Sequence, residues 1–99
     1  MAIVFVSVAP LGTATTSLSR YVAGVERILR ESGLTHQLTA MGTIIEGDLD
    51  AILPVLRRMH ESPFGEGAQR VSTLIKIDDR RDSPHSIEGK VRSVMEKLG

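Results

Sequence analysis

Hydrophobic residues recur in this chain with two different periods, and the order in which those periods alternate leaves few possible folds. Alternating, β-branched segments predict strands, whereas apolar residues spaced three or four positions apart predict helices. In chain order the signals predict strand, helix, strand, strand, helix, strand and helix, over residues 3–9, 18–32, 35–41, 43–47, 49–59, 70–78 and 86–98. The first six segments are those of a ferredoxin-like α+β domain, βαββαβ, with a four-stranded antiparallel sheet. The seventh is an added C-terminal helix.

Residues at the ends of these segments support the same boundaries. Each predicted helix is preceded by a side chain that can accept from its free N–H groups, namely Ser17, Asp48 and Ser86. Gly33 is a natural end for the first helix. Pro54 lacks an N–H and is expected to kink the second helix or to delay its start. Residues 61–70 have the composition of a loop.

The bulk composition limits the classes of function. The 99 residues suffice for one domain, 1–99, with a single core. The 12 basic and 12 acidic residues balance, so no basic surface for nucleic acid or for a membrane is expected. The chain has no cysteine, which excludes disulfides and thiolate metal sites. The apolar N-terminal stretch lacks a basic segment and is too short to span a bilayer, so a cytoplasmic location is expected.

The helices of a ferredoxin-like domain cover only one face of the sheet, and the period of two assigns strand residues to each face. The apolar sets are expected to lie against the helices: Val4, Val6 and Val8, and Val71, Thr73, Ile75 and Ile77. The residues left for the other face, called here the open face, are Ile3, Phe5, Ser7, Ile44, Glu46, Ser72, Leu74 and Lys76. This set mixes large apolar groups with one acid and one base, which suits an oligomer interface that contains a pocket. Sheet-to-sheet dimers, doubled into a tetramer, are therefore expected.

Glu46 has two interpretations. As a carboxylate near a strand end it can pair with Lys76 or with an arginine. Alternatively, it lies in a half-buried pocket and accepts hydrogen bonds from a protonated or amine-bearing heterocycle.

The last strand runs into five consecutive charges, at residues 78–82. They can form a solvated loop, or Asp79 and Arg80 can make ion pairs between subunits at the rim of a ligand site. Arginines inside the run and the absence of EF-hand spacing argue against a metal site. Ser83 and Pro84 are expected to turn the chain into the last helix.

No catalytic constellation is found. Ser7 has no nucleophile-elbow motif around it, and no glycine-rich phosphate loop is present. The three histidines, His36, His60 and His85, lie on different elements without ligand spacing and are expected at the surface. An enzyme of the monooxygenase or isomerase kind is disfavoured, because no histidine or tyrosine is expected on the open face.

Three blocks of the sequence carry a resemblance to a known family. They are SVAPLGT with SLSRYV, then MGTIIEGDLD, then IKIDDRRDSPHSIEGKV. In this order, and over essentially the whole chain, they resemble the small thiamine-binding proteins, relatives of the tandem-domain thiamine- and hydroxymethylpyrimidine-binding proteins. The resemblance implies a cytoplasmic, non-enzymatic homotetramer of ferredoxin-like subunits, without a cofactor, that binds thiamine or its pyrimidine part where subunits meet.

The resemblance, together with the assignment of strand residues to the two faces of the sheet, suggests which residues bind the ligand. Ser7, Thr43, Glu46 and Lys76 are expected in or near the pocket, with Asp79 and Arg80 at its rim. The alternative function is a small oligomeric regulatory or structural protein whose interface needs these polar residues and binds no vitamin.

Overall fold

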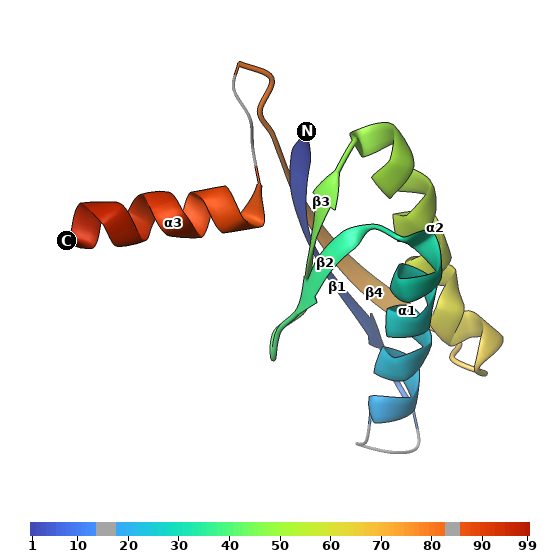
Figure 1. Cartoon of the computed structure of the whole chain (residues 1–99). Helices are drawn as coiled ribbons and strands as arrows, with labels where there is room; N and C mark the ends of the chain where they lie inside the picture. The colour runs from blue at the N-terminus through green and yellow to red at the C-terminus, as the bar shows by residue number, and fades with distance from the viewer. Residues whose placement is uncertain (14–17, 83–85) are drawn as a thin grey trace.

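The structure is a computed structural model that describes residues 1–13, 18–82 and 86–99. Its elements follow the predicted order (Figure 1): β1 Ala2–Pro10, α1 Ser19–Ser32, β2 Thr35–Leu38, β3 Thr43–Gly47, α2 Leu49–Gly65, β4 Val71–Asp79 and α3 Ile87–Leu98. The four strands form one antiparallel sheet in the order β2-β3-β1-β4. The predicted ferredoxin-like βαββαβ fold with an added C-terminal helix is confirmed.

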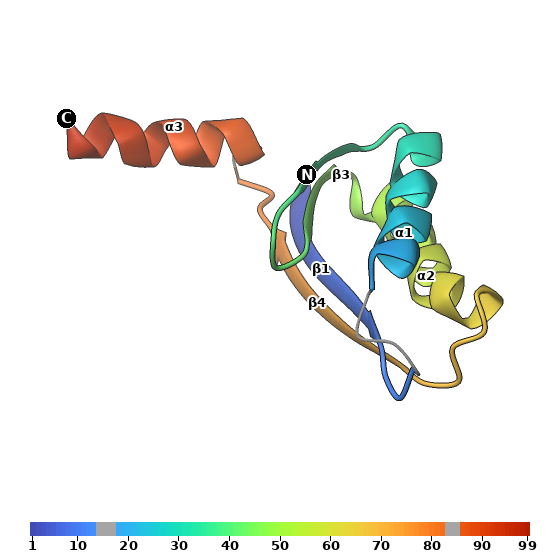
Figure 2. The ribbon, with the colours of Figure 1, turned by 90° about the horizontal axis from the view of Figure 1, so that it is seen from below.

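Helices α1 and α2 lie together on one side of the curved sheet, and the other side is open (Figure 2). The core lies between these two layers. Val4, Val6 and Ile45 from the sheet are at most 1% exposed, and they belong to one buried cluster with residues of both helices, including Leu29, Ile52 and Met59. The period-two assignment of β1 and β3 is therefore confirmed, since Ile3, Phe5 and Ile44 are only half-buried.

The expectation that the apolar side of β4 lies against the helices is wrong for two residues. Ile75 and Ile77 are 42% and 43% exposed. β4 is an edge strand of the sheet. The helices leave the side chains of Ile75 and Ile77 exposed, so these two residues lie beside the core rather than inside it.

The helix ends follow the predicted chemistry in part. Gly33 adopts the left-handed conformation, with φ of 74°, just after α1. The Ser86 hydroxyl oxygen accepts from the Gly89 N–H at 2.9 Å and caps α3. Asp48 precedes α2 as predicted, but its carbonyl rather than its side chain accepts from the helix. Leu18 holds the cap position of α1, and Ser17, Ser83, Pro84 and His85 lie outside the described residues.

Helix α2 is longer than the sequence predicts. It continues past Pro54 to Gly65, so the loop expected over 61–70 is wrong for its first half. The nitrogen of Pro54 would have bonded to the Asp50 carbonyl, and because Asp50 is exposed, water can take that place. Pro63 is buried, and its carbonyl accepts from the N–H groups of Glu66 and Ala68. The burial of Pro63 and these two hydrogen bonds stabilise the last turn of α2.

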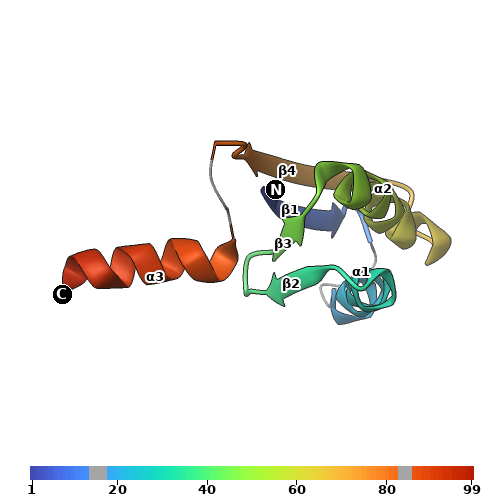
Figure 3. The same cartoon turned by 45° about the horizontal axis from the view of Figure 1, so that its top comes forward.

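Helix α3 stands apart from the body of the molecule (Figures 1 and 3). It starts at the end of the sheet where β1 begins and runs outward on the open side. None of its residues is buried. Within the described parts of the chain, no helix is both long and apolar enough to cross a lipid bilayer.

Candidate functional site

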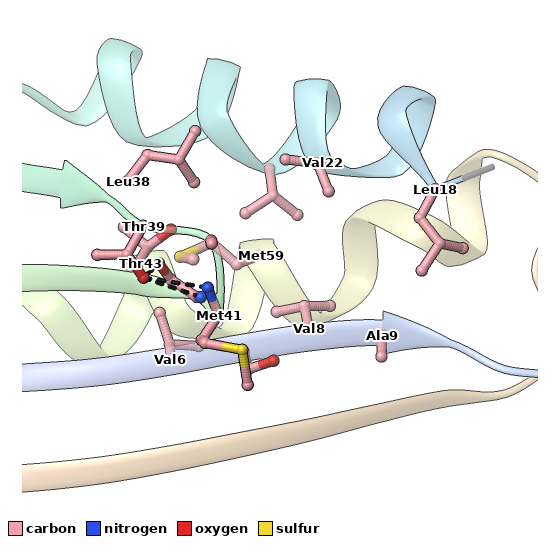
Figure 4. Close-up of a pocket in the computed structure, with 14 residues that line it drawn as sticks. Val6, Val8, Ala9, Leu18, Val22, Leu38, Thr39, Met41, Thr43 and Met59 are labelled. Carbon is pink, nitrogen blue, oxygen red and sulfur yellow. Dashed lines mark hydrogen bonds between the residues drawn. The ribbon is translucent and has the colours of Figure 1, made fainter.

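A cavity of about 300 Å³ lies between α1, the end of β1 and the turn that joins β2 to β3 (Figure 4). Its walls are mostly apolar. The apolar side chains come from four elements or turns: Val6 and Val8 of β1, Leu18, Val22 and Val25 beside and within α1, Leu38 and Met41 of the hairpin, and Met59 of α2. No described residue that lines the cavity has a titratable side chain.

Thr43 brings a polar group to this cavity. The residue is 4% exposed and pairs with Val6 in the register of β3 on β1, so its side chain lies on the helix-covered face. Its hydroxyl group makes no hydrogen bond to any other described residue. Its oxygen is not among the fully buried side-chain atoms without a partner in the described chain, so it is accessible from the cavity. A ligand in the cavity can therefore replace water as the hydrogen-bonding partner of this hydroxyl.

Thr39 shapes the mouth of the cavity. Its hydroxyl oxygen accepts from the N–H groups of Met41 (3.3 Å) and Gly42 (3.2 Å), and the hydroxyl donates to the Gly42 carbonyl at 2.7 Å (Figure 4). A tight turn results, with the Met41 side chain 80% exposed. A Cβ added at Gly42 would lie 2.7 Å from the Phe5 ring and 2.7 Å from the Val6 carbonyl, so only glycine fits this close approach.

The mouth of the cavity is itself apolar. Leu18, Val22 and Leu38 are 38%, 43% and 51% exposed at its border. A mostly apolar cleft with a few polar groups is the usual form of a small-molecule site. An apolar rim is suited to be covered by a larger ligand or by a protein surface.

Glu46 lies elsewhere, at the end of β3 on the open face. Its Oε2 accepts from the Ile87 N–H, the first of α3, at 2.6 Å. A carboxylate at a helix N-terminus interacts favourably with the free N–H groups and with the helix dipole. Neither Lys76 nor an arginine is its partner among the contacts of the described residues.

Lys76 also lies on the open face, opposite Phe5 in the pairing of β4 with β1. It borders a hollow of about 170 Å³ with Ile3, Phe5 and Ile44. Lys90 of α3 closes one side of this hollow, where its ammonium group pairs with Asp78 at 2.8 Å. The open face thus carries a mixed apolar and charged hollow, as the alternation of the sequence predicts.

The run of charges at the end of β4 and just beyond it pairs within the chain. Arg81 contacts Asp79 at 2.8 Å, and Arg80 contacts Asp82 at 2.7 Å. The hydrogen bond to Asp82 raises the pKa of Arg80 above its ordinary value. Pairing between subunits stays a prediction.

The six residues expected at the ligand site do not meet in one place. Glu46 and Lys76 share the open face, and Asp79 and Arg80 lie at and just beyond the end of β4. Thr43 lines the cavity on the other face. Ser7 borders that cavity too, but its place between Val6 and Val8 puts its side chain on the open face. One pocket was expected because Thr43 and Glu46 are only three positions apart in the chain, but they lie on opposite faces of the sheet.

Sequence reasoning did not identify most of the residues that line the cavity, notably Thr39, Met41 and Val22. One available signal was the pair of threonines around Ala-Met-Gly, since a threonine before a glycine turn often bonds to the turn's own backbone. The other lining residues come together only because α1 packs over β1, and the hydrophobic pattern of each segment does not specify that packing.

His36 and His60 are half-buried and each has a hydrogen-bonding partner, and His85 lies outside the described residues. His36 contacts the Leu34 carbonyl through Nδ1 (2.8 Å) and Glu26 Oε1 through Nε2 (2.9 Å). These two acceptors, the carbonyl foremost, raise the pKa of His36. His60 Nδ1 lies 2.7 Å from the Thr73 hydroxyl. Among the residues that the structure places, no group of three acidic or histidine side chains could hold a metal ion.

Comparison with known proteins gives the family. Residues 4–95 match the family described as thiamine-binding protein. The UPF0045 protein YqgV of Bacillus subtilis is 46% identical, over 99% of this chain and 98% of its own. A UPF0045 protein of Methanothermobacter thermautotrophicus is 42% identical, over 93% of this chain and 94% of its own.

Solved structures agree with this assignment. The protein MJ1052 of Methanocaldococcus jannaschii superimposes with a TM-score of 0.86 at 36% identity, over 96% of both chains. A Thermotoga maritima protein named for thiamine biosynthesis or salvage shares the fold, with a TM-score of 0.77 at 18% identity over 94% of this chain and 97% of its own. Sequence and fold together show that the chain belongs to the thiamine-binding protein family.

Proposed function

We propose that this protein is a non-enzymatic binder of thiamine or of its hydroxymethylpyrimidine part, and that the pyrimidine ring enters the cavity beneath α1. The observation that carries the proposal is the Thr43 hydroxyl, which makes no hydrogen bond to another described residue and is accessible from a mostly apolar cavity. An aminopyrimidine has a planar apolar face and polar atoms at its edge, so it matches such walls and such a group.

The mouth of the cavity suits the other half of thiamine. Met41 and Leu38 border it, and a polarizable thioether contacts the edge of an aromatic ring favourably. The thiazolium ring would lie there, between the hairpin and whatever covers it. A second subunit would cover the thiazolium ring, so the binding pocket would lie at a subunit interface.

The composition of the cavity supports binding without catalysis. Acid–base catalysis needs a titratable group within hydrogen-bond reach of the reacting atoms. The described lining supplies threonine hydroxyls, a serine and backbone groups, and none of them is paired with a base that could activate it.

The open face supports the proposal of a homo-oligomer, with sheet-to-sheet dimers that double into a tetramer. Leu74 is 64% exposed on this face, beside the half-buried Ile3, Phe5 and Ile44. Contiguous apolar surface of this kind is typical of protein interfaces. The same observation favours the second candidate, an oligomeric regulatory or structural protein without a vitamin ligand.

Thermal unfolding separates the two candidates. The melting temperature is measured against thiamine, its phosphates and hydroxymethylpyrimidine, for the natural protein and for Thr43→Val. A ligand that binds the folded state raises the melting temperature with its concentration. Thr35→Val is the matched control, since Thr35 is exposed in β2 and lies outside the cavity. No rise with any of these compounds would favour the oligomer without a vitamin.

A further inference from the structure

We infer that α3 is an assembly arm, whose apolar stripe packs on the open sheet face of a second copy of this chain. The inference depends on the oligomeric part of the proposed function and is independent of the ligand. It involves two surfaces, an apolar stripe on α3 and the open face of the sheet. Helix α3 runs away from the sheet of its own chain (Figure 2), and the apolar side chains of its stripe are exposed.

The stripe of α3 consists of exposed apolar side chains on one side of the helix. Val91, Val94, Met95 and Leu98 are between 57% and 77% exposed. An isolated helix of 12 residues is marginally stable in water, and most helical stability in proteins comes from packing an apolar side. A surface that covers this stripe is therefore needed for α3 to be a stable helix.

The chain's own sheet does not supply this surface, because α3 is fixed at its base. The Ile87 N–H donates to Glu46 at 2.6 Å, and Lys90 pairs with Asp78 at 2.8 Å. These contacts hold the first turns at the end of β3 and β4, and the helix leaves the sheet from there (Figures 1 and 2). Val94 to Leu98 consequently extend away from the chain that carries them.

A second copy offers a complementary surface of sufficient size. A helix of 12 residues is about 18 Å long and about 10 Å wide, so half of its lateral surface, with a solvent shell, measures roughly 350 Å². If each chain buries this stripe and an equal area of its open face, it loses roughly 700 Å² of exposed surface. A standard stable interface buries about 800 Å² per partner.

If two chains pack their α3 helices on each other's open faces, the resulting dimer is a closed assembly. Each chain has one arm and one face, so a twofold axis satisfies both contacts in a dimer and leaves no further copy to be added at this surface. The arm would cover Leu74 and the hollow beside Phe5 and Lys76.

Disulfide trapping tests the contact directly, because the natural chain has no cysteine. Val94→Cys and Leu74→Cys are made as separate proteins, mixed after partial unfolding and refolding, and oxidised gently. Ile75→Cys is the matched control, since it is in the same strand, is also exposed at 42%, and points to the opposite face. The inference predicts a disulfide-linked dimer in the mixture of Val94→Cys with Leu74→Cys, several-fold more abundant than in the mixture with Ile75→Cys.

Light scattering on the unmodified protein makes the outcomes distinct. Equal trapping of both mixtures, or preferential trapping at Ile75, in a protein that is oligomeric would overturn the role of α3 and leave the oligomer proposal standing. A natural protein with the mass of one chain, 10.8 kDa, would overturn both. Val94→Glu with Leu98→Glu is expected to give this single-chain mass with unchanged far-ultraviolet circular dichroism of the sheet. Thiamine binding is measured separately, because it affects neither the test of the α3 contact nor the test of the oligomer.

Discussion

The Glu46 carboxylate accepts a hydrogen bond of 2.6 Å from the Ile87 N–H and so joins the end of β3 to the first turn of α3 across 41 positions of the chain. With Lys90 and Asp78, this contact sets the direction of the C-terminal helix. Glu46, which the sequence suggests as a ligand-binding residue, thus helps to hold α3 in place. Variants of Glu46 can therefore test its role in thiamine binding and its role in positioning α3 by separate measurements.

Replacing Glu46 is expected to loosen α3. Glu46→Ala removes a charged acceptor and should cost about 1–3 kcal/mol at this contact, whereas Glu46→Gln keeps an acceptor and should cost less. Hydrogen exchange of the Ile87 and Lys90 amides reports the effect, with faster exchange in the alanine variant. Calorimetry on Glu46→Gln addresses the other role: an unchanged affinity for thiamine removes this carboxylate from the ligand site.

His36 is expected to make stability depend on pH. Its two acceptors, the Leu34 carbonyl and Glu26, raise its pKa in the folded state above the ordinary value of 6.5. The contribution of the charged ring is therefore fully present below the unfolded pKa and is lost as pH rises through the higher folded pKa. His36→Gln should flatten this dependence.

Urea unfolding at pH 5.5 and at pH 8.5 checks this prediction. The natural protein should lose more stability than His36→Gln between the two values. Glu26→Gln should also reduce the loss, because Glu26 provides part of the attraction. Parallel curves for the natural protein and His36→Gln would contradict the proposed contact.

Gly42→Ala is expected to destabilise the protein by about 1–3 kcal/mol, the usual cost of overpacking. The added carbon would lie 2.7 Å from both the Phe5 ring and the Val6 carbonyl, and the carbonyl belongs to a central strand that cannot move aside. Gly65→Ala is the control, because nothing lies within 4 Å of its added carbon. Urea midpoints of the two variants should differ clearly; similar midpoints would show that the turn can shift.

Filling the cavity is expected to block binding without unfolding the protein. Val22 lies at the border of the cavity and is 43% exposed, so a larger side chain can grow into the mouth while the core stays packed. Val22→Phe should abolish the thermal shift caused by thiamine and change the melting temperature of the free protein little. Full retention of the shift in this variant would place the ligand elsewhere.

The order of elements was predictable because each strand and helix has its own hydrophobic period, and Gly33 and Ser86 mark two helix ends locally. The last turn of α2 was not predictable, because Pro63 is tolerated there through burial against the core. Exposure of Ile75 was missed for a related reason: alternation shows which side a residue faces but not how far a helix extends over it.

The candidate site was predictable only in parts. Strand alternation correctly places Glu46 and Lys76 on the open face, and the same rule places Thr43 on the other. Proximity along the chain suggested one pocket where the structure has a cavity and a separate hollow. The cavity itself depends on the turn that Thr39 holds and on the position of α1.

The central claim is tested most directly by the melting temperature of the natural protein and of Thr43→Val against increasing thiamine. At a free concentration one hundred times the dissociation constant, a ligand stabilises the folded state by about 2.7 kcal/mol, and each kcal/mol is about 4–8 °C for a domain of this size. We predict a concentration-dependent rise in the natural protein and in Thr35→Val, and a rise that requires at least tenfold more thiamine in Thr43→Val. Equal rises in all three proteins, or no rise in the natural protein, would contradict binding in the cavity beneath α1.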